Sequence, residues 1–155
     1  MIRIANNSDF EQINIIRKQV SKIHSDNEDK IFKNDFSNEF RDYLLEYFGS
    51  DEKVAIVCEI EKQIVGYVML DFIVKPETVY SYEQKFVNIC EFGVLESCRS
   101  KGIGKQLLEF VINFAKEKHF DEIRLDAWNF NNGAVEFYKR NGFENYRSYF
   151  RMFLK

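Results

Sequence analysis

The stretch VLESCRSKGIGK, residues 94–105, joins an apolar run to a strongly amphipathic segment. Gly102 and Gly104 stand two positions apart within it. Positive side chains surround these glycines, namely Arg99, Lys101 and Lys105. The spacing predicts a loop that opens into a helix, where the first backbone N–H groups have no partner within the helix. Since the helix dipole is positive at that end, we expect the loop to bind an anion, most simply a phosphate.

The segments on either side of this loop have the periods of strands and of a helix. Residues 86–94 are apolar and rich in β-branched side chains, and residues 123–127 alternate between apolar and charged. Between them, apolar side chains recur every three or four positions over residues 102–118, which predicts a helix. A strand–helix–strand unit needs a right-handed crossover, so the two strands are expected to be parallel neighbours.

The rest of the chain adds further strands and helices. We expect strands over residues 2–4, 54–60, 63–74 and 143–154, and helices over residues 9–24, 35–48 and 132–141. Glu61 and Lys62 are expected to form a hairpin turn, and Gly142 to end the last helix. The order predicts an α/β fold with a mixed, mostly antiparallel central sheet and helices on both faces.

Length and composition narrow the class of protein. The chain has 155 residues, 45% of them apolar, which is enough for one domain spanning residues 1–155. The net charge of −3 predicts no strong nonspecific attraction to nucleic acid. No apolar run approaches the roughly 20 residues of a membrane span, and the first residues lack an apolar leader. We therefore expect a cytoplasmic protein without membrane or nucleic-acid partners.

The three cysteines do not predict a metal site. They form no CxxC pair, so neither a structural zinc site nor a disulfide framework is expected. Cys58 and Cys90 are expected to be small buried residues within strands.

Two familiar phosphate motifs do not fit the loop. A P-loop requires Ser or Thr where Gln106 stands, and a dinucleotide fingerprint requires a third glycine where Leu107 stands. The pattern that remains is Arg-x-x-Gly-x-Gly, supplied by Arg99, Gly102 and Gly104.

A second block, WNFNNGAVEFYKRNGF, occupies residues 128–143. With the loop, it makes the chain similar to the GNAT superfamily of N-acetyltransferases. That superfamily has Arg-x-x-Gly-x-Gly at the same junction and, further on, Asn, Ala, Tyr and Gly-Phe at set spacings. The matching residues of the second block are Asn131, Ala134, Tyr138, Gly142 and Phe143.

The resemblance implies acetyl-coenzyme A as co-substrate and no metal. It implies a V-shaped splay between the fourth and fifth strands, in which the pantetheine arm lies while the loop binds the pyrophosphate. The residues implied in binding are Phe92, Gly93, Val94, Arg99, Ser100, Lys101, Gly102, Ile103, Gly104, Lys105, Asn131, Ala134 and Tyr138.

Two of these positions also allow a purely structural role. Gly93, a glycine within a strand, indicates a bulge or a close approach of another backbone. Alternatively, a neighbouring aromatic ring leaves no room for a side chain at this position. Asn131 either binds the pantetheine or caps the last helix.

The chemistry of amine acetylation needs a base and an acid. An alkylamine has a pKa near 10.4 and must lose a proton to react, and Glu91 is our candidate acceptor, directly or through a water. The alternative for Glu91 is a salt bridge. Family resemblance places Tyr138 beside the sulfur, where it would protonate the leaving thiolate; its alternative is a core tyrosine.

The acceptor is less defined than the cofactor. Acidic residues gather in and around the first two predicted helices, which favours a cationic small-molecule amine over a protein, although a solvated helix face explains them as well. They are Asp26, Glu28, Asp29, Asp35 and Glu39. The alternatives are a protein or peptide N-acetyltransferase and a noncatalytic acyl-coenzyme A sensor. The sequence leaves the oligomeric state open, a homodimer included.

Overall fold

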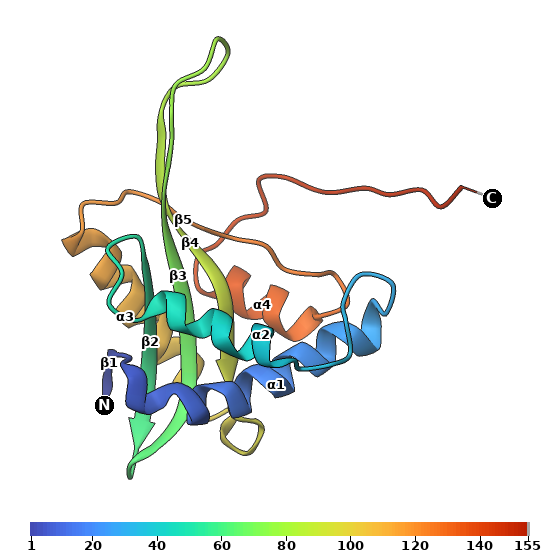
Figure 1. The fold of residues 1–155 in the computed structure, drawn as a ribbon. Helices are drawn as coiled ribbons and strands as arrows, with labels where there is room; N and C mark the ends of the chain where they lie inside the picture. The colour runs from blue at the N-terminus through green and yellow to red at the C-terminus, as the bar shows by residue number, and fades with distance from the viewer. Residues whose placement is uncertain (155) are drawn as a thin grey trace.

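The computed structural model describes residues 1–154 and contains a five-stranded sheet in the order β1-β2-β3-β4-β5 (Figure 1). The strands are β1 (Ile2–Ile4), β2 (Lys53–Ile60), β3 (Gln63–Lys75), β4 (Gln84–Val94) and β5 (Ile123–Leu125). Neighbouring strands are antiparallel except for β4 and β5, which are parallel. The predicted mixed, mostly antiparallel sheet is confirmed.

Helices cover both faces of the sheet, as predicted. The helices are α1 (Phe10–Asn27), α2 (Asn38–Asp42), α3 (Ile103–Glu117) and α4 (Asn132–Arg140), and short 3-10 turns span Asn7–Asp9, Tyr43–Tyr47 and Glu96–Cys98. One layer of the core joins α3 to the sheet, and the other joins α1 and the Tyr43–Tyr47 turn to it. Alternation along β2 supplies both layers, since Ile56 packs under α3 and Val57 under α1.

The predicted turn between β2 and β3 is present. Glu61 and Lys62 have φ angles of 49° and 66°, the left-handed values of a two-residue hairpin turn whose twist matches that of the strands.

A β-bulge at Cys90 changes which face of the sheet the following side chains of β4 occupy. Met69 pairs with Glu91 and Leu70 with Ile89, so Cys90 is an extra residue on its strand. Ile89 packs in the α3 layer, and without the bulge Glu91 would point to that same face. Cys90 itself is exposed, so its predicted burial is wrong, whereas Cys58 is buried as expected.

The two parallel strands separate at one end. β4 and β5 pair only where Val87–Ile89 faces Ile123–Leu125. β5 then ends, while β4 continues to Val94 with no strand on that side within the described residues. The predicted splay between the fourth and fifth strands therefore exposes the edge of β4 over residues 90–94.

Two predicted elements differ in the structure. The helix expected over residues 35–48 begins only at Asn38, because the Ser37 hydroxyl accepts the Phe40 N–H at 3.1 Å and caps it there; the chain then tightens into the 3-10 turn. The strand expected over residues 143–154 is wrong: residues 143–154 form neither strand nor helix. They run away from the body as an extended arm (Figure 1), since a strand needs a neighbouring edge with which to pair.

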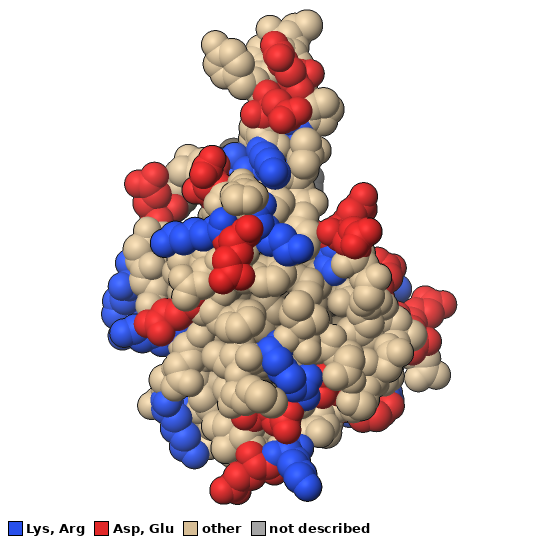
Figure 2. Space-filling view, turned by 90° about the vertical axis from the view of Figure 1, so that its left-hand side faces the viewer, with Lys and Arg blue, Asp and Glu red and all other residues tan. Residues whose placement is uncertain are grey.

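The hairpin of β3 and β4 also projects beyond the body (Figure 1). On the face shown in Figure 2, Lys and Arg side chains are interspersed with Asp and Glu, so no large field of one sign forms there. Among the described residues, no helix combines the length and apolar character that a bilayer crossing demands.

Candidate active site

The predicted anion loop leads directly into α3. Gly102 stands at the N-cap of the helix with a φ of 80°, a left-handed value that glycine adopts without strain. No side chain caps this helix end. The first bond at this end runs from the Gln106 N–H to the Gly102 carbonyl at 3.1 Å.

The backbone N–H groups of Ile103, Gly104 and Lys105 are left without an acceptor among the residues that the structure describes. Nothing lies within 4 Å of the position that a Cβ on Gly102 would take, so the space beside this glycine is open. Together with the positive end of the helix dipole, they form a site that suits a phosphate group.

The charged side chains of the loop differ in how firmly they are held. Arg99 donates from Nε to the Val94 carbonyl at 3.3 Å, which ties it to the end of β4. Lys105 lies 3.8 Å from Glu109 on the outside of α3. Ser100 has a φ of 62°, and both it and Lys101 are exposed. Of the charged side chains, Arg99 is the one positioned by the strand that precedes the loop.

Gly104 provides close packing between two helices. A Cβ at this position would lie 3.4 Å from the Phe137 ring of α4 and 3.7 Å from Phe92 of β4. The glycine thus lets α4 pack closely against the beginning of α3.

Gly93 is required for packing. A Cβ there would lie 2.6 Å from the Tyr67 ring, 2.9 Å from Val20 and 3.1 Å from Ile16. Of the two alternatives from the sequence, the structure shows the packing need, and the bulge lies instead at Cys90. Phe92 and Val94 point to the other face, where they pack against the α3 layer.

Glu91 faces α1 and takes part in a salt bridge that the sequence left as an alternative. Its Oε2 accepts from Arg17 Nε at 2.9 Å and from the Tyr67 hydroxyl at 3.0 Å, while Oε1 accepts from Arg17 Nη2 at 3.0 Å. The Arg17 side chain is fully buried, whereas that of Glu91 is 21% exposed. Burial raises the pKa of Tyr67 well above its ordinary value, so Tyr67 remains a donor to the carboxylate.

Arg17 and Tyr67 are functional candidates that the sequence reasoning missed. Arg17 also donates from Nη1 to Asn14 and to the Phe40 carbonyl, each at 2.9 Å, and its guanidinium lies 4.6 Å from the centre of the Phe40 ring. The available signal was a charged residue at position 17 on the apolar face of a predicted helix. A buried arginine requires an acidic partner, and a salt bridge was one of the two roles considered for Glu91.

Tyr138 lies on α4, with its ring edge-on to Phe92 at 6.3 Å and to Phe143 at 5.5 Å. Burial raises the pKa of Tyr138 to about 12. Its hydroxyl makes no hydrogen bond to any described residue. The group is therefore a protonated phenol that is free to donate to a ligand beside β4.

Asn131 caps α4, the structural alternative of the two that the sequence allowed. Its Oδ1 accepts the Ala134 N–H at 3.3 Å. Ala134 lies in the first turn of α4, the helix that carries Tyr138. The cap thus helps to fix the start of that helix.

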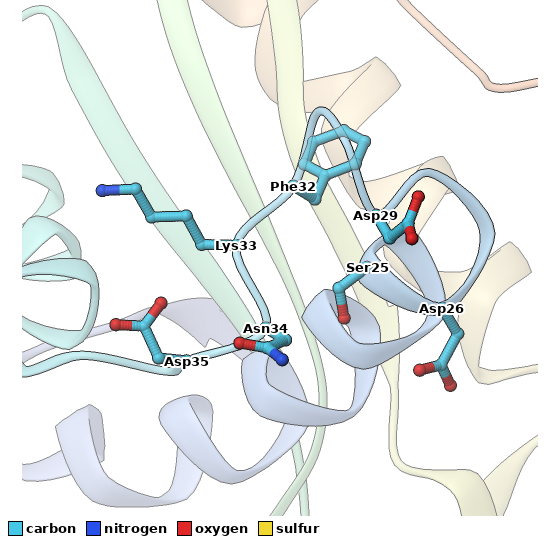
Figure 3. Close-up of a pocket in the computed structure, with 7 residues that line it drawn as sticks. All are labelled: Ser25, Asp26, Asp29, Phe32, Lys33, Asn34 and Asp35. Atoms are coloured by element: carbon cyan, nitrogen blue, oxygen red, sulfur yellow. The ribbon is translucent and has the colours of Figure 1, made fainter.

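An aromatic cluster joins the end of α1 to the segment after β5. The His24 ring lies 5.1 Å from Phe32 and 5.8 Å from Phe130, and Trp128 lies 5.4 Å from Phe32. Phe32 also lines an adjacent pocket of about 360 Å³ (Figure 3). The pocket is lined by Ser25, Asp26, Asp29, Phe32, Lys33, Asn34 and Asp35.

This pocket brings together part of the acidic set found in the sequence. It contains Asp26, Asp29 and Asp35, while Glu28 pairs with Arg151 at 2.7 Å and Glu39 lies on α2. Asp26 pairs with Lys22 at 2.6 Å, which leaves Asp29 and Asp35 as the acids of the pocket that form no ion pair with a described residue, beside Lys33 and the Phe32 ring. Carboxylates beside an aromatic ring favour a cationic ligand. Within the described part of the chain, no three His, Cys, Asp or Glu side chains gather as a metal site would require.

Comparison with known proteins shows the family of this chain. Residues 18–143 match the model of the acetyltransferase (GNAT) family. That match spans both the anion loop and α4, and the chain belongs to this family.

The relatives include N-acetyltransferases of several kinds. The chain is 36% identical over 95 residues to an uncharacterized N-acetyltransferase of Methanocaldococcus jannaschii, covering 61% of this chain and 40% of that protein. It is 29% identical over 101 residues to streptothricin acetyltransferase A of Bacillus subtilis, covering 65% and 58%. The chain thus spans only part of the curated relatives that it matches.

Solved structures share the whole fold. A tetramutant of the BH1408 protein from Bacillus halodurans superposes with a TM-score of 0.94 at 24% identity, covering 99% of each chain. AAC(6')-Iy, in complex with the bisubstrate analog CoA-S-monomethyl-acetylneamine, superposes with a TM-score of 0.78 at 17% identity, covering 100% of this chain and 97% of that one. At these identities the likeness shows the fold.

Proposed function

We propose that this protein transfers an acetyl group from acetyl-coenzyme A to a primary amine of a small cationic molecule. The observation that carries the proposal is the open, uncapped start of α3 at Gly102, next to the bare edge of β4. Family membership and the coenzyme A analog in AAC(6')-Iy support the same assignment.

The anion loop fits the diphosphate of coenzyme A. The N–H groups of Ile103, Gly104 and Lys105 would donate to it, with Ser100, Lys101 and Gly102 of the loop lying around it. Arg99, held at Val94, would add a positive charge. The edge of β4 over Phe92, Gly93 and Val94 would hold the pantetheine through backbone groups, since no strand occupies that side in the described structure.

When bound, acetyl-coenzyme A supplies the acetyl group as a thioester. Glu91 would then accept the proton of the attacking amine. Because Arg17 and Tyr67 occupy three of the acceptor positions on its carboxylate, Glu91 retains capacity for a further bond, to the amine or to a bridging water. Tyr138 would donate its proton to the departing sulfur, a role suited to its free hydroxyl.

The acceptor would bind at the pocket beside Phe32. The carboxylates of Asp26, Asp29 and Asp35 would attract an amine that carries additional positive charge, and the aromatic cluster would bound the site. One relative is named streptothricin acetyltransferase A, and AAC(6')-Iy is named an aminoglycoside N-acetyltransferase. These names support a small-molecule acceptor here.

The test is an acceptor panel. Purified protein is incubated with acetyl-coenzyme A and one amine at a time, and release of the coenzyme A thiol is followed. The amines are aminoglycosides, polyamines, simple alkylamines and peptides with free N-termini or lysines. We expect release with at least one small polycationic amine. Release with peptides alone would favour a protein N-acetyltransferase, whereas saturable coenzyme A binding without turnover on any amine would favour a sensor.

A further inference from the structure

The side chain of Tyr67 on β3 reaches Glu91 on β4 by lying over a glycine. In the register of the two strands, Tyr67 pairs with Gly93 and Met69 pairs with Glu91, so the tyrosine starts two residues away from the carboxylate. A Cβ on Gly93 would lie 2.6 Å from Cε1 of the Tyr67 ring. Because Gly93 has no side chain, the ring can lie across β4, and its hydroxyl donates to Glu91 Oε2 at 3.0 Å.

The two carboxylate oxygens of Glu91 differ in the number of bonds that they accept. Oε2 accepts two, from Arg17 Nε and from the Tyr67 hydroxyl, whereas Oε1 accepts one, from Arg17 Nη2. A carboxylate oxygen has two lone pairs, so Oε2 is fully occupied and Oε1 retains one free position. The Glu91 side chain is 21% exposed, which lets a ligand or a water reach the carboxylate. Oε1 is therefore the oxygen with room for a proton.

Both donors to Glu91 are buried and fixed by their surroundings. Arg17 is also held from α1 and α2, because its Nη1 donates to Asn14 Oδ1 and to the Phe40 carbonyl, each at 2.9 Å. The Tyr67 ring is packed in the core layer beneath α1. Turning the carboxylate would break at least one of these bonds and leave a buried donor unpaired, which costs free energy. The orientation of the Glu91 carboxylate is thus fixed by the same two donors.

We propose that Tyr67 is a positioning residue for acetyl transfer: with Arg17 Nε it occupies Oε2 of Glu91 and leaves Oε1 to take the proton of the amine. This inference rests on the proposed function, in which Glu91 is the proton acceptor. In the transfer, a bond forms between the amine nitrogen and the acetyl carbon, and the carbon–sulfur bond breaks. The amine proton goes to Oε1, directly or through one water, and Tyr138 gives its proton to the sulfur. Solvent then takes the proton from Glu91 and returns one to Tyr138.

Removing the Tyr67 hydroxyl should slow the transfer without abolishing it, because Tyr67 does not touch the reacting atoms. Tyr67→Phe should lower kcat by about 10-fold, while KM for the amine and Kd for coenzyme A stay within about twofold. A carboxylate that loses a donor to its charged form becomes more basic. The acid limb of the pH profile of kcat should therefore move to higher pH, by about one unit.

A second readout does not depend on activity. In protein whose glutamate side-chain carboxyl carbons carry an NMR-active label, the Glu91 resonance is identified by its absence in Glu91→Gln, and it should move in Tyr67→Phe near neutral pH. The matched control is Tyr47→Phe, since Tyr47 is also buried and donates its hydroxyl to a carboxylate, that of Asp71, at 2.7 Å. This control loses a hydrogen bond of the same kind and should leave the Glu91 resonance, kcat and the acid limb unchanged.

An unmoved Glu91 resonance in Tyr67→Phe would overturn the inference, and so would a moved resonance with kcat and the acid limb at their wild-type values. In either case, low turnover in Glu91→Gln would leave the proposed function standing. An equal loss of kcat in Tyr47→Phe would trace the effect to stability and would also overturn the inference. Full activity of Glu91→Gln is a different result, because it would remove Glu91 from the proposed proton transfer and the role of Tyr67 with it.

Discussion

Arg17 on α1 and Glu91 on β4 form a two-point ion pair, with nitrogen–oxygen distances of 2.9 and 3.0 Å, across the face of the sheet that α1 covers. The arginine side is fully buried and the carboxylate side is partly open. Arg17 therefore contributes to stability, whereas Glu91 can also be reached by a ligand. Substitutions can separate the effect on stability from the effect on activity.

Arg17→Met should destabilise the protein by about 3–5 kcal/mol, because it leaves a carboxylate without its buried partner. Adding Glu91→Met should recover much of that loss, since an apolar pair replaces an ionic one, but acetyl transfer should stay low. Urea unfolding and thiol release measure the two effects. Full activity in Glu91→Gln alone would remove this carboxylate from the proposed proton transfer.

Gly102→Ala should weaken coenzyme A binding by about 10-fold, because a side chain at a φ of 80° strains the backbone that presents the N–H groups. Isothermal titration with coenzyme A measures the affinity. The control is Gly49→Ala, which has a φ of 72° and equally open surroundings outside the loop. If the two variants bind coenzyme A equally well, the anion loop is not where the diphosphate lies.

Tyr138→Phe should lower turnover by about 100-fold and leave coenzyme A affinity within about twofold, since only the hydroxyl is lost. Because the pKa of Tyr138 is raised to about 12, the phenol stays protonated through mildly alkaline pH, and its ionisation should not reduce the rate there. Tyr43→Phe, on the 3-10 turn after α2, is the control. Unchanged turnover in Tyr138→Phe would assign the ring a packing role alone.

The pocket beside Phe32 should recognise charge. Asp29→Asn with Asp35→Asn should raise KM for a polycationic amine by about 10-fold, with kcat within about twofold, since the lost attraction acts before the chemical step. The effect should shrink as salt is added. Asp51→Asn, an exposed acid before β2, is the control. An unchanged KM would show that these carboxylates are solvated surface residues that do not bind the amine.

Asp9 should make stability depend on pH in the acid range. The Arg3 guanidinium bonds both of its carboxylate oxygens, at 2.8 and 2.9 Å, and lowers the pKa of Asp9. A lowered folded pKa gives stability that is present above the unfolded value, near 3.9, and is lost as pH falls through the folded one. Asp9→Asn should therefore be less stable than the wild type by about 1–2 kcal/mol at neutral pH, and the difference should shrink below about pH 4. A difference that grows on acidification in urea unfolding would contradict this.

The sequence predicted those elements whose signals are local. The turn at Glu61 and Lys62, the loop that opens into a helix at Gly102 and the end of α4 at Gly142 each depend on a few neighbouring residues, and all three are in the structure. The fold class followed from the periodicity of the strands and helices. The loop of the proposed site was found the same way, from glycine spacing and adjacent charge.

The elements that depend on distant partners were not predicted. Arg17 finds Glu91 across 74 positions of sequence, and the bulge at Cys90 depends on how β4 registers with β3. The last strand failed for the same reason, because periodicity predicts an extended segment without saying which edge it joins.

Cys90 acts as a one-residue insertion in the side-chain alternation of β4. Before Cys90, odd-numbered side chains such as Ile89 face the α3 layer, and after it odd-numbered side chains such as Glu91 face α1. Substituting or deleting Cys90 should leave Ile89 and Glu91 on opposite faces, because they pair with the neighbouring residues Leu70 and Met69 of β3. A residue inserted into β3 opposite Cys90 would instead pair with it, and would turn Glu91 toward the apolar packing under α3 and Phe92 toward Arg17. The unpaired position of Cys90 opposite β3, and not the chemistry of its side chain, therefore decides which layer Glu91 faces.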